Sequence, residues 1–164
     1  MFSLVQDGDE ALKQSASEWN FSNPPAPIEQ VEEALERLMR DENGIGFAAN
    51  QMGLLYRVFA MQIDSEVRFY YNPEILTKSD EEVVIEEGCL SFPGLYFKVK
   101  RAKQVMVRYQ DSTGVFHEET MDGIAARCFQ HELDHLDGVC FTDRVSKLTL
   151  DMAKKKRDKR ERKY

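Results

Sequence analysis

The sequence predicts an α+β fold in which antiparallel sheets pack around a central helix that carries an H-E-x-x-H motif. Paired β-prone runs joined by short polar turns fill the middle of the chain, as is typical of antiparallel hairpins. A segment with helical spacing, residues 124–136, follows these strands and contains the motif. Strands grouped before a helix favour an α+β fold over alternating βαβ units.

Length and composition are those of one folded domain. The 164 residues are near the common size of a domain, with 42% hydrophobic and 31% charged residues. No stretch approaches the roughly 20 apolar residues that cross a bilayer, and residues 1–13 carry acidic side chains where a signal peptide has basic ones. Three cysteines without a framework spacing favour a reducing compartment. We therefore expect one catalytic domain over residues 1–164, cytoplasmic and without a membrane partner.

The first predicted helix covers residues 28–40. Apolar residues recur there at helical spacing between glutamates, at Ile28, Val31, Leu35 and Leu38. The dipeptide Asn43-Gly44 supplies a stop signal. One face of this helix is therefore expected to lie in the core.

Two hairpins are predicted next. The β-prone residues 57–63 and 67–71 are joined by a polar turn, and Asn72-Pro73 is expected to end the second strand. Residues 104–110 and 115–121 flank the stronger turn sequence Asp-Ser-Thr-Gly. His117 lies in the last of these strands and is expected at the surface.

The C-terminal segment becomes strongly basic. A helix that frays is expected from Ser146, with weak order beyond Lys156. Residues 153–164, the basic tail, hold eight Lys or Arg against two acidic residues, a charge of +6, so the remainder of this −7 chain carries −13. An acidic body does not attract nucleic acid as a whole, whereas the tail could contact phosphates or remain solvated.

His131 and His135 occupy the two ends of the H-E-x-x-H motif. On a helix, residues i and i+4 lie on the same face, so both imidazoles can bind one metal ion. Glu132 points about 100° around the helix and can reach ion-bound water as a general base. Two of the three histidines in the chain fall in this motif, which makes a chance match improbable.

A catalytic ion usually has three protein ligands and an open position for water. Cys128 lies seven residues from His135 on the same helix, roughly 10 Å along the axis, which favours a core position instead of a ligand role. Cys140 lies two residues after Gly138 and could fold back, whereas Cys89 directly follows Gly88, which lets the backbone approach a crowded site. Spacing alone does not choose between Cys89 and Cys140.

Three segments together resemble the signature motifs of peptide deformylases. In chain order they are residues 44–51 (GIGFAANQ), 87–91 (EGCLS) and 130–135 (QHELDH), and the resemblance covers roughly residues 26–145. The family removes formate from the N-formylmethionine that begins new chains in bacterial and organellar translation. It uses a metal ion, usually Fe²⁺, held by one Cys and two His.

The resemblance implies a role for each matching residue. It selects Cys89 as the third ligand beside His131 and His135, with Fe²⁺ as the native ion; by donor chemistry Zn²⁺, Ni²⁺ or Co²⁺ could substitute. Glu132 becomes the base, while Gln51 and the backbone N–H of Leu90 help to stabilise the oxyanion.

The implied substrate is a formyl-Met nascent peptide. Glycines at 44 and 46 suit a peptide bound as an added strand, because they permit close backbone approach. The family pattern gives a substrate-binding set, in which the alternative for the apolar members is an ordinary core position: Ile45, Gly46, Glu87, Gly88, Ile124 and Cys128. Arg101 is expected to balance the charge of Glu87. In some members the C-terminal helix docks on the ribosome, and the basic tail is the candidate for that contact here.

Two other functions remain open from the sequence. One is a zinc metallopeptidase whose third ligand is Glu161 or another downstream carboxylate. The other is a ribosome- or RNA-binding module with a structural metal, led by the basic tail. Phe47, Asn50 and Tyr96 differ from residues common in the deformylase family, which bears on the entrance to the site and the preferred peptide.

Overall fold

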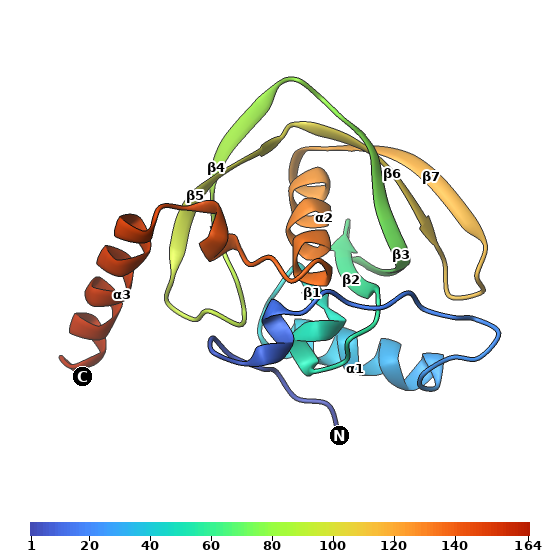
Figure 1. The fold of residues 1–164 in the computed structure, drawn as a ribbon, viewed down its shortest axis with the longest axis horizontal. Helices are drawn as coiled ribbons and strands as arrows, with labels where there is room; N and C mark the ends of the chain where they lie inside the picture. The colour runs from blue at the N-terminus through green and yellow to red at the C-terminus, as the bar shows by residue number, and fades with distance from the viewer.

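The computed structural model describes residues 1–164 (Figure 1). Its α-helices are α1 (Ile28–Asp41), α2 (Gly123–Leu136) and α3 (Lys147–Glu161), and its short 3₁₀ helices are η1 (Glu10–Lys13), η2 (Ala49–Met52) and η3 (Phe141–Arg144). The strands are β1 (Gly46–Ala48), β2 (Val58–Ile63), β3 (Glu66–Lys78), β4 (Glu82–Gly88), β5 (Tyr96–Ala102), β6 (Gln104–Gln110) and β7 (Phe116–Asp122). None of the helices combines the length and apolar character needed to span a membrane.

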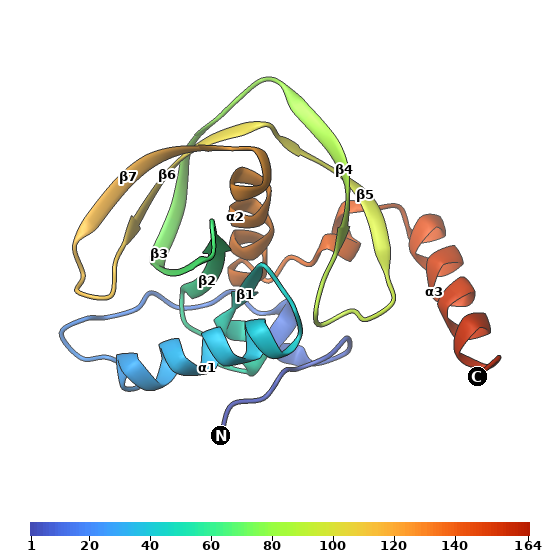
Figure 2. The same ribbon diagram turned by 180° about the vertical axis from the view of Figure 1, so that it is seen from behind.

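All the strand pairs of the two sheets are antiparallel. One sheet has the order β1-β2-β3-β6-β7, and β4 pairs with β5 in the other. Figure 1 and Figure 2 show α2 enclosed beneath the arch of strands, with α1 below it and α3 projecting to one side. The α+β prediction is confirmed, and the H-E-x-x-H motif lies in α2.

Three hydrophobic clusters hold these elements together. The first joins the five-stranded sheet to α2, where Phe129 packs edge-on against Phe59 at 5.1 Å and Tyr70 at 5.6 Å between ring centroids. The second lies between α1 and the strands β1 and β2, and the third lies between the β4–β5 hairpin and η3. The helix α2 itself contacts strands of both sheets and η2, so the polar residues of its motif are buried.

The first helix and the second hairpin form where the sequence predicts them. In α1, the predicted apolar face is buried at Val31, Leu35 and Leu38. The strands β6 and β7 pair in continuous register from Gln104 to Gln110. His117 is exposed on β7, as expected, where it bonds to Asp111 at 2.7 Å.

The prediction that Asn72-Pro73 ends a strand is wrong. Strand β3 continues to Lys78, with a register shift against β6 between Tyr71 and Glu74. Asn72 adopts a left-handed backbone (φ 46°), and its side chain accepts from Trp19 N at 2.7 Å and donates to Trp19 O at 3.0 Å. This irregularity tolerates the proline, which has no N–H for the ladder.

The β4–β5 hairpin is not among the elements predicted from the sequence. Its inward positions on β5 are Phe97, Val99 and Arg101, which alternate with exposed residues. That period of two was visible in the sequence, but a charged residue at the third inward position obscured it. The hairpin is important because Cys89 follows β4 directly.

The expectation of weak order beyond Lys156 is also wrong, because α3 extends to Glu161. Ser146 caps the helix by accepting from Thr149 N at 3.1 Å. Leu150 and Ala153 pack against the third cluster, and Lys154 pairs with Asp7 at 3.2 Å. The basic tail is therefore the second half of an anchored helix.

Candidate active site

Three predicted ligand side chains meet at one point. The ligand atoms of Cys89, His131 and His135 all lie within 4.8 Å of one another. The two histidines are one turn apart on α2, and Cys89 Sγ lies 3.3 Å from His135 Nε2. The group contains neither Glu161 nor the other two cysteines. This removes the basis for a metallopeptidase whose third ligand is Glu161.

The other cysteines have different surroundings. Cys140 is buried in the third cluster, with its Sγ 3.7 Å from the backbone oxygen of Leu12. Cys128 is buried within the first cluster, and its Sγ lies 3.6 Å from Ile45 O. All three cysteines are free thiols.

The donor set fits a divalent transition metal. Two imidazoles and one thiolate are ligands that Zn²⁺ and Fe²⁺ accept, and three protein ligands leave a position for water. Burial lowers the pKa of His135 well below its usual value, which favours the neutral ring that a metal ligand needs. Burial also acts to lower the pKa of His131, but without a metal its hydrogen bonds with Cys89 and Glu87 outweigh this and raise the pKa to about 10. His131 Nδ1 hydrogen-bonds to Glu87 Oε1 at 2.9 Å, which leaves Nε2 as the ring nitrogen that can bind a metal.

Glu87 orients His131 from a buried network of charges. Arg101 donates to both Glu87 oxygens, at 2.6 and 3.0 Å, which confirms the pairing expected from the sequence. Arg127 donates to the same carboxylate and to the backbone oxygens of Val99 and Val83. Burial acts to raise the pKa of Glu87, but hydrogen bonds from His131 and Arg101 outweigh it and lower the pKa to about 2. The carboxylate is therefore ionised whenever the protein is folded near neutrality.

Arg127 is a site residue that was not predicted from the sequence. It lies on α2 four residues before His131, on a stretch of the helix that is buried. A charged residue at a position expected to be buried was the available signal, because such a group needs a partner.

Glu132 is enclosed beside the ligands. Its side chain is buried, and its Oε2 has no hydrogen-bond partner within the chain. Burial raises the pKa of Glu132 to about 7, although His131 and Arg101 act to lower it. A carboxyl group with a pKa near neutrality can both accept and return a proton.

Gln51 and Leu90 flank Cys89. Gln51 is buried in η2; its Oε1 accepts from Ala48 N at 2.9 Å, and its Nε2 lies 3.7 Å from Cys89 Sγ and 3.2 Å from Ser91 Oγ. The Leu90 N–H donates no hydrogen bond within the chain. Two hydrogen-bond donors therefore lie beside the metal ligands. The Gln51 amide is held by other hydrogen bonds, and the Leu90 N–H has no partner within the chain.

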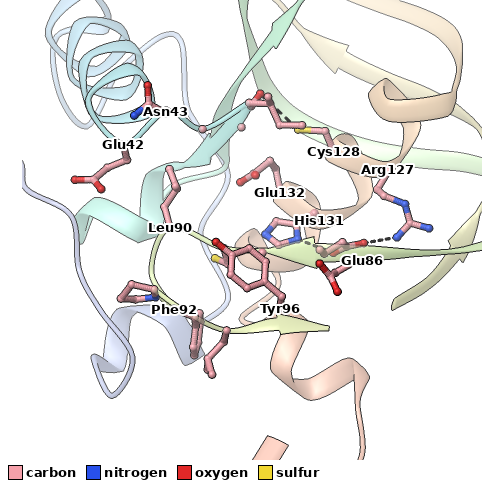
Figure 3. Close-up of a pocket in the computed structure, with 18 of the residues that line it drawn as sticks. Glu42, Asn43, Glu86, Leu90, Phe92, Tyr96, Arg127, Cys128, His131 and Glu132 are labelled. Carbon is pink, nitrogen blue, oxygen red and sulfur yellow. Dashed lines mark hydrogen bonds and ion pairs between the residues drawn. The ribbon is translucent and has the colours of Figure 1, made fainter. Parts of the chain in front are cut away.

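A cavity of about 510 Å³ opens onto these groups. Figure 3 shows Cys128, His131 and Glu132 extending from α2 toward it, with Leu90 and Tyr96 on its other side. All the substrate-binding residues expected from the sequence line this cavity: Ile45, Gly46, Glu87, Gly88, Ile124 and Cys128. Ile45 and Ile124 are 53% and 63% exposed, so they are not core residues, whereas Cys128 belongs to both the core and the cavity wall. Ile85 and Tyr96 also line the cavity and were not in that set.

Comparisons with known proteins all identify the same protein family. The family model described as polypeptide deformylase matches residues 1–151. A peptide deformylase of Thermotoga neapolitana is 40% identical over 152 residues, which cover 88% of this chain and 87% of the relative. One from a Bradyrhizobium species is 46% identical over 138 residues and 79% of each chain.

Solved structures agree with the sequence relatives. The peptide deformylase of Synechococcus elongatus in complex with actinonin superposes with a TM-score of 0.89 at 33% identity, covering 96% of this chain and 88% of that one. The enzyme of Legionella pneumophila also gives 0.89, at 34% identity over 99% and 96%. With a Cys-His-His centre beside a buried glutamate and a match along most of its length, this chain belongs to the polypeptide deformylase family, metallohydrolases that remove the formyl group from N-formyl peptides.

Proposed function

We propose that Cys89, His131 and His135 bind one divalent ion and that Glu132 carries the proton during hydrolysis of N-formylmethionyl peptides. The observation that carries this proposal is the convergence of the three ligand atoms within 4.8 Å of one another. The buried carboxylate of Glu132 lies one residue after the first histidine, at the wall of the same cavity.

The ion, when bound, supplies the Lewis acidity that makes water a nucleophile near neutral pH. Glu132 accepts a proton from the water molecule as the water oxygen bonds to the formyl carbon. It then returns that proton to the amine nitrogen as the carbon–nitrogen bond breaks. The products are formate and a peptide with a free amino terminus, so no other reactant is needed.

Gln51 and Leu90 act on the negative oxygen of the tetrahedral intermediate. The Gln51 carboxamide is held by Ala48 N and Ser91 Oγ, so it needs no reordering when charge develops. The Leu90 N–H has no partner within the chain and is available to donate. Each such donor is worth about 3 kcal/mol in the transition state.

The substrate backbone pairs with the free edge of β1. This strand ends the five-stranded sheet and pairs with β2 alone, so its other edge can accept an added strand. Ile45, Ile124 and Cys128 provide apolar surface for the methionine side chain, with Gly46 and Gly88 allowing close approach. A related structure from Acinetobacter baumannii, with a TM-score of 0.83 at 31% identity over 88% of this chain and 98% of that one, is described as Met-Ala-Ser bound.

Fe²⁺ is the native ion in this proposal, and Zn²⁺, Ni²⁺ or Co²⁺ can substitute because the same donors accept them. The cytoplasm is the proposed compartment, since the three cysteines are free thiols.

Formate release from a formyl-Met peptide tests the reaction. Protein purified without oxygen is expected to release formate, and Glu132→Ala is expected to lose at least about 10²-fold in rate. The metal content of both proteins serves as the control, because Glu132 is not among the ligands. An inactive metal-loaded wild type, or an active Glu132→Ala, would contradict the proposal.

A second proposal concerns α3, which we infer to be a ribosome contact. Its exposed surface carries Lys155 and Lys159 one turn apart, and the helix projects from the acidic body (Figure 2). Phosphate contacts through such residues weaken with salt. Lys155→Glu with Lys159→Glu is expected to reduce co-sedimentation with ribosomes while formate release is unchanged. Unchanged co-sedimentation at low salt would remove the idea.

A further inference from the structure

Asn50 lies against the last turn of α2 and has no part in the chemistry described above. It is fully buried in η2, and its Nδ2 donates to the backbone oxygen of His135. Turning the carboxamide over would place two carbonyl oxygens against each other, so this orientation is fixed. The Oδ1 atom is left buried without any hydrogen-bond partner.

His135 has a buried nitrogen, Nδ1, that can donate a hydrogen bond but has no partner. Its side chain is 1% exposed, its Nε2 faces Cys89 Sγ, and its Nδ1 is buried without a partner. A histidine that binds a cation through Nε2 keeps its proton on Nδ1, where it needs an acceptor. Two residues already in contact therefore carry a buried acceptor and a buried donor, each unused.

The side chains of the other two ligands each contact a neighbouring polar side chain. Glu87 accepts from His131 Nδ1 at 2.9 Å, and Gln51 Nε2 approaches Cys89 Sγ at 3.7 Å. Of the two histidine ligands, His131 has its outer ring nitrogen bonded to Glu87, whereas the outer ring nitrogen of His135 has no partner. Asn50 is the neighbour of Gln51 in η2, so this one short helix reaches two ligands from adjacent positions.

We propose that Asn50 is a positioning residue for His135. Its Nδ2 holds the carbonyl of His135, and its Oδ1 accepts from His135 Nδ1–H, directly or through one buried water, when the ion is bound. This contact fixes the tautomer that presents Nε2 to the ion. The inference rests on the proposed metal centre but not on the substrate, so a wrong substrate would leave it intact.

The test compares Asn50→Leu with wild type and with Tyr70→Phe, all loaded with Co²⁺. Tyr70 is the matched control, because its hydroxyl is also buried without a partner and it packs on Phe129 of α2. The readouts are Co²⁺ affinity, measured by competition with a chelator, and the visible d–d spectrum. Asn50→Leu is expected to bind Co²⁺ about 10- to 100-fold more weakly, with a shifted spectrum, whereas Tyr70→Phe keeps both.

A merely structural role would lower the melting temperature of Asn50→Leu and leave its Co²⁺ affinity and spectrum at wild-type values, which would overturn the proposal. If Asn50→Leu does not fold, nitrogen NMR of the Zn²⁺-loaded wild type decides. The expected result is a slowly exchanging His135 Nδ1–H with a coupling to Asn50 or to a bound water that Asn50 holds. A His135 Nδ1–H bonded to any other group would overturn it.

Discussion

Gly46→Ala tests whether the position of Glu132 controls the reaction. A Cβ atom on residue 46 would lie 2.5 Å from Glu132 Oε1, 2.9 Å from Glu132 Cδ and 2.6 Å from Cys128 Sγ. Ordinary contacts between such atoms are about 3.5–4.0 Å, so the carboxylate must move by about 1 Å. Both neighbours are buried, so the movement has little room.

A displacement of about 1 Å in a catalytic group costs about 10²-fold in rate. This corresponds to about 2.7 kcal/mol of lost transition-state stabilisation. The assay is kcat/KM for formate release, with metal content and thermal unfolding measured on the same protein. We expect a loss of about 10²-fold with the metal retained, because the atoms nearest the added Cβ belong to Glu132 and Cys128, which are not among the metal ligands.

Gly44→Ala is the matched control on the same segment. Its Cβ would meet the Cδ1 atom of Leu90 at 2.6 Å, the end of a flexible side chain that can change rotamer for about 1 kcal/mol. We expect a loss of less than about tenfold from that change. A folded, metal-loaded Gly46→Ala with kcat/KM close to that of wild type would refute the role given to Glu132.

The buried charges give two further predictions. Arg101→Met removes both contacts to Glu87 and should lower the free energy of unfolding by about 3–5 kcal/mol, measured by denaturant titration; a change below about 1 kcal/mol would contradict this. The folded pKa of Glu87 is about 2, below its usual 4.5, so its stabilising effect is complete above about pH 4.5 and is lost as the pH falls toward 2. The difference corresponds to about 3 kcal/mol, and metal-free Glu87→Gln should lack this part of the pH dependence of unfolding. The same pH dependence of unfolding in wild type and Glu87→Gln would contradict this prediction.

Local sequence patterns were sufficient to predict features that depend on residues close together in the chain. The i, i+4 spacing of His131 and His135 needed only a helix, and residues 124–136 contain no glycine or proline to interrupt one. Cys89 is 42 residues before His131, so its approach to the two histidines depends on how β4 lies against α2. Spacing alone therefore did not distinguish Cys89 from Cys140 as the third ligand. The resemblance to known motifs resolved that choice.

Features that depend on tertiary contacts were not predictable. Strand β3 passes Pro73 because Asn72 bonds to the backbone of Trp19, 53 residues away in the sequence. The order of α3 beyond Lys156 follows from packing of its first half on the third cluster, which its basic composition does not reveal. Asn50 likewise has no local signal, since its partner is His135, 85 residues away in the sequence.

The metal content of Cys89→Ala, measured beside its Co²⁺ spectrum, tests the centre most directly. The wild type should bind one Co²⁺ per chain with a near-ultraviolet sulfur-to-cobalt charge-transfer band, since a thiolate and two imidazoles surround the ion. Cys89→Ala should lose the band and most of the metal, while Cys140→Ala keeps both. A Cys89→Ala protein that retains a full complement of metal with an unchanged spectrum would contradict the proposed centre.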